Sequence, residues 1–283
     1  MMKARWDLVL IPPLLVSLAL LVISQSVFLY GSFRRDLGMG KLGAELEFFN
    51  YFQVFADPYY LATLKLSIEA SLAATILTVF IAFPVAYVIA RMRSRWAMFL
   101  LAAVVVSSFV TIVIKVLGLI LIFSSNGPFN RLLLALGLID ESVTIIGTLS
   151  GVVVGLMYYS LGYAVLLFYS VVMTVPRSVE EAAESLGATR YGVFLQVVLP
   201  LCLPGLVAGI LTVFNVSMGG FSSTALIGAG KVLTVPVVIQ RTMLLETNFG
   251  MAATLAALLL LSVVMINVIS VVAVSRVRKG LVL

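Results

Sequence analysis

Six long apolar runs dominate this 283-residue chain, and each is close to the length that a helix needs to cross a lipid bilayer, about 20 residues. In lipid every backbone N–H and C=O must find its partner within the chain, which favours helices for uninterrupted runs of this length. Composition agrees, since 62% of the residues are hydrophobic and 11% are charged. We therefore predict an all-α membrane protein with six transmembrane helices, over Leu8–Tyr30, Leu61–Ala90, Met98–Phe123, Gly147–Val175, Phe194–Ser217 and Met251–Ser275.

The basic residues gather at one set of helix ends. The net charge is +6, and a basic excess can also indicate nucleic-acid binding. Here the N-terminus and the segments after the second, fourth and sixth runs carry the unbalanced Lys and Arg, whereas Asp and Glu match them on the other side. The positive-inside rule then predicts that both termini are cytoplasmic, with no nucleic-acid partner. The first run is longer than a signal peptide's apolar core, so we expect it to remain as a span.

The chain lacks the parts for most catalytic sites. It has no histidine and one cysteine, Cys202, within an apolar run, so zinc sites, disulfides and His-assisted nucleophiles are excluded or incomplete. A Gly-Ala-Gly-Lys stretch over 228–231 resembles a phosphate-binding loop, but that loop requires Gly where Ala225 stands and Ser or Thr where Val232 stands. We expect no enzymatic activity, no catalytic residue, no cofactor and no metal.

Glycine and proline positions predict how the spans pack. Gly147, Gly151 and Gly155 recur every fourth residue, as do Gly205 and Gly209, a spacing that lets helix backbones approach closely. Prolines at 84, 200 and 204 are expected to kink their spans. Two external segments, Gly31–Tyr60 and Gly219–Gly250, are long enough to fold on the membrane surface. The aromatic residues of the first would form an interfacial belt or meet an external partner.

A short amphipathic helix is predicted after the fourth run. Pro176 ends the preceding span, and Ser178 with Glu181 three residues later is the pattern of a capping box. An apolar face follows the i, i+3, i+4, i+7 spacing, and Gly187 supplies a residue that can end a helix in a left-handed turn. The apolar face consists of Val179, Ala182, Ala183 and Leu186, and the acidic flank, suited to a partner's arginines, of Glu180, Glu181 and Glu184.

The same stretch carries a family resemblance. Glu181-Ala182-Ala183, then Gly187, then Val197-Val198-Leu199-Pro200 match the EAA signature of binding-protein-dependent ABC importer permeases, with Val197 in place of the usual Ile. The chain from Asn50 onward also resembles the spermidine/putrescine permease subfamily, through the Ser67–Arg91 segment and Gly127–Asn130. That subfamily carries an Arg flanked by aromatics where this chain has Lys115 between aliphatic residues, which leaves the solute open. The Glu-Ala-Ala tripeptide taken alone would also fit an ordinary helix at the membrane interface, without any role in an importer.

The resemblance implies a fold and a set of partners. It implies a type I importer (MetI-like) permease domain over 1–283: a first span with its external loop (1–60), a five-helix core (61–275) that contains the EAA loop (176–200), and a cytoplasmic tail (276–283). It also implies a bacterial inner-membrane location and a coupling helix that docks on an ATPase dimer. The remaining partners are a second permease, expected to be a paralogue, an external solute-binding protein and membrane lipid.

Charged and polar residues inside the spans are the candidates for the translocation pathway, because charge in a bilayer is costly. Glu69 and Lys115 are candidates for an ion pair that lines the path or its gate. Alternatively the two residues form a structural salt bridge that only specifies packing, or the Lys115 side chain extends until its ammonium group reaches the membrane–water interface. Asn215 and Ser217 in the fifth span are further candidates.

Other functions remain open at this level. An ion-coupled secondary transporter would need carboxylates at the bilayer midplane and an inverted internal repeat. Glu69 is weak support for such a carboxylate, and the sequence shows no repeat. A channel or membrane scaffold would not need the coupling helix. Among importers, iron, phosphonate, thiamine and opine-like solutes are alternatives to polyamines.

Overall fold

In the computed structural model, which describes residues 6–38 and 40–281, six helical segments are long and apolar enough to cross a membrane. Five of them match the predicted spans to within a few residues at each end. Contacts divide the chain into two units, with boundaries at 64/65, 236/237 and 264/265. The prediction of a single permease domain is not tested by this division and stays a prediction.

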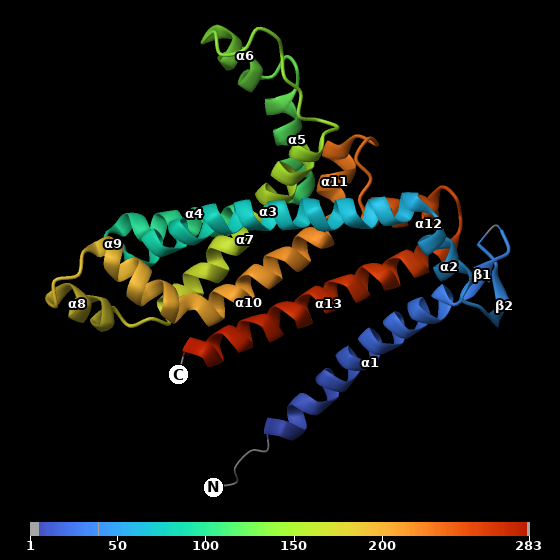
Figure 1. The fold of residues 1–283 in the computed structure, drawn as a ribbon, viewed down its shortest axis with the longest axis horizontal. Helices are drawn as coiled ribbons and strands as arrows, with labels where there is room; N and C mark the ends of the chain where they lie inside the picture. The colour runs from blue at the N-terminus through green and yellow to red at the C-terminus, as the bar shows by residue number, and fades with distance from the viewer. Residues whose placement is uncertain (1–5, 39, 282–283) are drawn as a thin grey trace. The chain divides into compact units, whose positions relative to one another are not determined.

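The first unit contains the N-terminal span and the folded segment 31–60. Its elements are α1 (Trp6–Ser32), β1 (Arg34–Asp36), β2 (Leu42–Leu46), α2 (Phe49–Ala56), the start of α3, and the adjoining parts of α12 (Val235–Leu244) and α13 (Phe249–Leu281). The strands β1 and β2 pair antiparallel. The expectation that 31–60 is a folded segment is confirmed, since it contains β1, β2 and α2 (Figure 1).

Buried polar residues hold the segment 31–60 in place. The amide of Asn50 donates to the carbonyls of Ser32 and Arg34, at 3.3 and 2.9 Å, and the hydroxyl of Thr254 donates to Ser32 O at 2.9 Å. Gly250 lies against Arg34 O, where a side chain would clash. The start of α13 is therefore fixed to the end of α1 and to β1.

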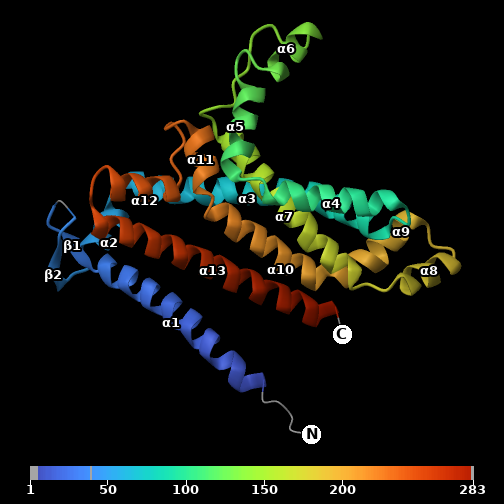
Figure 2. The ribbon, with the colours of Figure 1, turned by 180° about the vertical axis from the view of Figure 1, so that it is seen from behind.

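The second unit is a helical bundle centred on α7. Helix α7 (Leu149–Met173) contacts α4, α5, α10 and α11. The other elements of the unit are most of α3 (Pro58–Arg91), α4 (Arg95–Phe109), α5 (Ile112–Phe123), α6 (Pro128–Ala135), α8 (Arg177–Ser185), α9 (Arg190–Val193), the π-helical turn η1 (Phe194–Val198), α10 (Leu199–Met218), α11 (Phe221–Gly228) and the part of α13 from Met265 on. Figure 2 shows α8 and α9 at one end of this unit, far from α5 and α6.

The prediction of one continuous third span over Met98–Phe123 is wrong. Helix α4 ends at Phe109 and α5 begins at Ile112, because Val110 and Thr111 are extended, with ψ of 130° and 143°. The membrane-length segment here is Ile112–Ala135. Hydropathy misses the break because Val110 and Thr111 continue an apolar run and no proline or glycine marks the position.

The glycine spacing has the predicted role at four of its five positions. A side chain at Gly205 would meet Val171, one at Gly209 would meet Leu167 and Phe168, and Gly151 and Gly155 are similarly enclosed on α7. Gly147 is different, since it precedes α7 and has a φ of +77°, so it is a turn residue. Cys202 is buried in the core, as expected.

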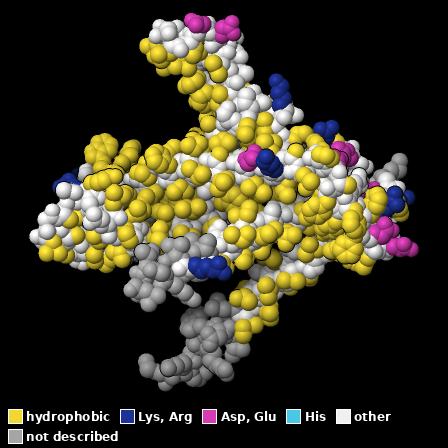
Figure 3. Space-filling model, viewed as in Figure 1, with side chains coloured by type: hydrophobic (Ala, Val, Ile, Leu, Met, Phe, Trp, Pro, Cys, Tyr) yellow, Lys and Arg dark blue, Asp and Glu magenta, His cyan; other side chains and the backbone are white. Residues whose placement is uncertain are grey.

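The surface of the chain is largely apolar. Hydrophobic side chains cover most of the face in Figure 3, and the charged ones are few and scattered. The short helices α11 and α12, of 8 and 10 residues, confirm that the segment 219–250 is folded. An apolar surface of this kind is stable only when lipid or protein covers it.

Candidate functional site

Helix α8 forms where the sequence predicts it, but its N-cap residue lies two positions earlier than expected. Pro176 is the N-cap residue, with φ −63° and ψ 137°, and no side chain caps the helix. The predicted capping box of Ser178 and Glu181 is therefore wrong, because Ser178 already lies within the helix and the carboxylate of Glu181 bonds to Arg93. The start of a helix tolerates proline well, because no hydrogen bond within the helix requires the N–H group that proline lacks.

The predicted end of α8 is confirmed. Gly187 has a φ of +90°. Its N–H donates to Glu184 O at 2.9 Å, and the N–H of Ala188 donates to Ala183 O at 3.1 Å. These two bonds form a Schellman motif, in which a left-handed residue satisfies the last helical carbonyls. The α8 backbone therefore ends at Gly187 and turns back toward α9.

Most of the predicted apolar face is accessible. Leu186 is 91% exposed, Val179 is 39% exposed, and Ala182 is also exposed. Ala183 is the exception, because it packs against the buried core that α3, α7 and α10 share. The exposed part of this face, Val179, Ala182 and Leu186, is therefore free to contact another protein.

Two of the three glutamates on α8 already have partners within the chain. Glu180 pairs with Arg91 at 2.5 Å, and Glu181 pairs with Arg93 at 3.1 Å. The first pair is largely buried, with each side chain 13% exposed, whereas Arg93 and Glu181 are 79% and 61% exposed. Glu180 and Glu181 thus already pair with arginines of this chain, and of the three glutamates only Glu184 has no ion pair in the described part of the chain.

The predicted pairing of Glu69 with Lys115 is also wrong. Glu69 instead lies 3.8 Å from Lys65, in an exposed pair one helical turn apart. Lys115, at 8% exposed, has its ammonium group 5.9 Å from the ring centroid of Tyr158 on α7. Among the described residues Lys115 makes no ion pair, and it is a buried lysine one turn beyond the break between α4 and α5.

The other two pathway candidates also have separate surroundings. Asn215 on α10 exchanges amide hydrogen bonds with Asn267 on α13, at 2.8 and 3.4 Å. Ser217 is buried, and its hydroxyl has no hydrogen-bond partner within 6–38 and 40–281. The structure therefore does not gather Glu69, Lys115, Asn215 and Ser217 into one polar site.

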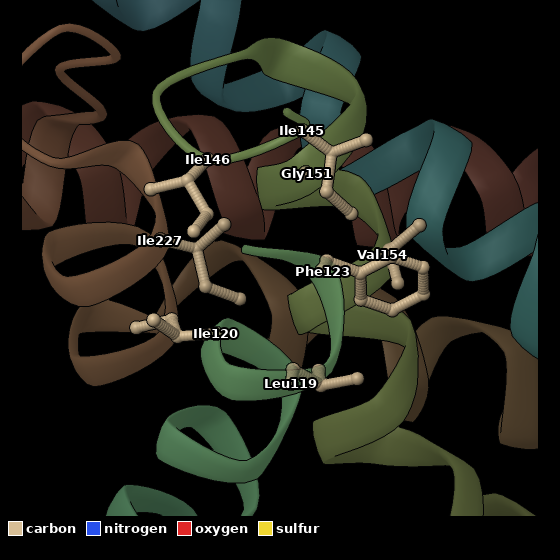
Figure 4. A pocket seen from close by; sticks show the side chains of 8 residues that line it. All are labelled: Leu119, Ile120, Phe123, Ile145, Ile146, Gly151, Val154 and Ile227. Carbon is tan, nitrogen blue, oxygen red and sulfur yellow. The ribbon is translucent and has the colours of Figure 1, made fainter. Parts of the chain in front are cut away.

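Two hollows in the second unit are apolar. A groove of about 540 Å³ lies between α3, α4 and α7, and Ser107 and Tyr158 are the polar residues of its lining. A second hollow, of about 10 Å³, holds at most about one water molecule. Figure 4 shows that aliphatic side chains and Phe123 surround it, between α5, α7 and α11.

Sequence reasoning misses three residues here: Arg91, Tyr158 and Asn267. Arg91 could have been singled out in the sequence, since it is the first basic residue after the second span. The positive-inside rule already explains a basic residue there, so nothing in the sequence indicates its pairing with Glu180. The described residues hold no cluster of three or more His, Cys, Asp or Glu suited to a metal ion. The Gly-Ala-Gly-Lys stretch is the turn after α11, where Ala229 is left-handed.

Comparison with known proteins places the chain in a family. Residues 74–279 match the family model described as "Binding-protein-dependent transport system inner membrane component". The chain is 31% identical over 215 residues to the spermidine/putrescine transport system permease protein PotB of Haemophilus influenzae, covering 75% of each chain. It is 26% identical over 220 residues to the probable sulfate transport system permease protein cysT of Chlorokybus atmophyticus, covering 76% of this chain and 74% of the relative.

The fold is shared with solved importers. A chain in the crystal structure of a bacterial ABC transporter that imports alginate matches over 96% of both chains, with a TM-score of 0.75 at 17% identity. The likeness confirms the predicted type I importer (MetI-like) permease fold with six transmembrane helices. The family match covers well over half of the chain and contains α8 with its EAA signature. The chain thus belongs to the family of binding-protein-dependent transport system inner membrane components, as a multi-pass permease subunit of an ABC importer.

Proposed function

We propose that this permease subunit forms, with a second and distinct permease, the translocation pathway for a polyamine-type solute. The relatives named as spermidine/putrescine permeases support the solute class. An ATPase dimer would supply the energy, and an external binding protein would deliver the solute. In this arrangement the EAA end faces the cytoplasm, together with both termini, as the distribution of Lys and Arg predicts.

The observation that carries the proposal is the exposed apolar tip of α8. Leu186 and Val179 face outward from a helix whose other side packs on the bundle. The stretch that resembles a phosphate-binding loop lacks the required residues, so we place ATP hydrolysis on a partner that binds this tip. ATP can shift the permease only if the tip fits two ATPase states differently.

The proposal predicts an ATP-hydrolysing complex that moves polyamine. The tagged chain would be purified from its native membranes in mild detergent, assayed for ATP hydrolysis, and reconstituted in liposomes with its binding protein and radiolabelled spermidine. We expect hydrolysis and ATP-dependent spermidine uptake in the same preparation. Purification of the chain without ATPase activity would contradict the proposed energy source. Hydrolysis that drives uptake of another solute would contradict only the polyamine assignment.

A second candidate solute class is anionic. Lys115 is a buried cation without an ion-pair partner in the described part of the chain, and such a group favours a negatively charged ligand over a polycation. A relative named as a sulfate permease is compatible with this. Competition of the uptake assay with sulfate or a dicarboxylate, against an equal excess of putrescine, separates the two classes.

Replacement of Lys115 tests its place in the pathway. We expect Lys115→Met to lower uptake about tenfold and Lys115→Arg to keep most of it, because a charge held in the membrane is costly unless it is used. Lys65→Met is the matched control, since that lysine is exposed. Wild-type uptake by Lys115→Met, with the ATPase bound in normal amount, would show that Lys115 is not part of the translocation pathway.

A further inference from the structure

The buried pair Arg91–Glu180 joins two helices that are far apart in sequence. Arg91 is the last residue of α3, and Glu180 lies in the first turn of α8. Their charged atoms are 2.5 Å apart, and each side chain is 13% exposed. A pair this buried differs from the exposed ion pairs that typically contribute little.

Arg91 also holds the end of α7. Its Nη2 donates to Val175 O at 3.0 Å and to Val172 O at 3.3 Å. These carbonyls lie at the C-terminal end of α7, where helical C=O groups have no partner within the helix and a cation is favoured. One guanidinium group thus contacts the ends of α3 and α7 and the start of α8.

Two further bonds connect the same elements. The hydroxyl of Tyr87 on α3 donates to Glu180 Oε2 at 3.4 Å, and Arg177 at the start of α8 donates to Ala90 O at 2.9 Å. The link from α8 to α3 therefore has three hydrogen-bonding or ionic side-chain contacts, in addition to the packing of Ala183 on the core that α3, α7 and α10 share. A displaced α8 would pull on α3 as well as on α7.

The pair is incompletely satisfied. Arg91 Nε has no hydrogen-bond partner in the described structure, and Glu180 Oε1 meets Arg91 as an ion pair without hydrogen-bond geometry. Buried charges with unused donors and acceptors are costly. Such a contact is suited to a joint that changes its bonds between two states of the bundle.

Helix α3 can carry a displacement across the membrane. It runs continuously from Pro58 to Arg91. Within the second unit it bonds to α7 through Thr78 and Ser160 at 3.0 Å, and near its other end Ser67 Oγ accepts from the N–H of Val235 at 2.8 Å. Movement at Arg91 is therefore connected to residues at the opposite end of the same helix.

We propose that the Arg91–Glu180 pair is the joint that transmits displacement of α8 to α3, and that Glu180 positions α8 on the bundle instead of contacting the ATPase. The inference rests on the proposed function, since it requires an ATPase that moves α8. It assigns separate roles to neighbouring glutamates of the EAA helix: Glu180 faces inward, and Glu181 stays exposed.

The test measures solute uptake per ATP hydrolysed by the complete reconstituted complex. We expect Arg91→Gln and Glu180→Gln each to lower this ratio at least tenfold, with the ATPase co-purifying as in the wild type. The double variant should fall no further than either single one, because both remove the same contact. Arg91→Lys, which keeps the charge with fewer hydrogen bonds, should be intermediate. Arg95→Gln is the matched control, because this exposed arginine lies four residues away, undergoes the same charge change and forms no ion pair among the described residues.

The possible failures can be told apart. A wild-type complex without coupled uptake would contradict the proposed function itself. Wild-type coupling ratios in both single variants would overturn the joint. Loss of the ATPase from Glu180→Gln in proportion to its loss of uptake would instead make Glu180 a docking residue. If Arg91→Gln does not reach the membrane, the Arg91→Lys ratio decides between a joint and no joint.

Discussion

Replacement of Leu186 by glutamate is expected to abolish uptake. The leucine is 91% exposed at the tip of α8, and its burial in an ATPase cleft would make it a central contact of that interface. Loss of such a contact typically costs about 2 kcal/mol or more, roughly a 30-fold loss of affinity. A buried, unpaired carboxylate would add to that cost. The measurement is the amount of ATPase that co-purifies with the tagged permease, together with uptake.

The neighbouring residue provides the control for this prediction. Ser185→Glu introduces the same charge one position away, outside the apolar face of Val179, Ala182 and Leu186, and removes only a local bond to Glu181 O. We expect this variant to keep most of its ATPase. Equal retention of the ATPase by both variants would show that Leu186 does not lie in the docking interface.

Replacement of Gly151 by valine is expected to destabilise the second unit. A side chain at this position of α7 would collide with the carbonyl oxygen of Ile145, and Ile227 lies 3.1 Å away (Figure 4). Backbone cannot move aside as a flexible side chain does, so the helix must shift, at a typical cost of about 1–3 kcal/mol. We expect a thermal midpoint lower by several degrees, measured as the monodisperse fraction that survives heating in detergent.

Gly118 supplies the matched substitution for that test. It is also a helical glycine, on α5, but no atom outside its own helix lies within 4 Å of the position that a side chain would take. Gly118→Val should therefore change the midpoint little. The same midpoint in Gly151→Val as in Gly118→Val would argue against close packing of α7 on Ile145 and α11.

Local patterns in the sequence were sufficient for much of this architecture. Five spans were placed within a few residues, because apolar length alone decides whether a helix can cross lipid. Gly187 was identified as the end of α8, because few residues other than glycine adopt a left-handed φ readily. The EAA spacing indicated the family, which the match over 74–279 confirms.

Patterns failed where a partner lies elsewhere in the chain. The break at Val110–Thr111 has no local signal, since both residues continue an apolar run. The capping box was predicted from spacing alone, but Glu181 bonds to Arg93 instead of to the start of its own helix. Hydropathy and spacing describe neighbours in sequence, whereas these contacts depend on how separate helices are packed.

The sequence by itself determined five of the six spans and the position of the EAA helix, because each depends on composition or on residues a few positions apart. Tertiary structure alone decided what that helix contacts. It placed Glu180 against Arg91 and left Leu186 exposed, and it set Lys115 beside Tyr158 instead of Glu69. The physical reason is that a charge in an apolar bundle takes the partner that folding brings within a few ångströms, and sequence distance does not specify that partner.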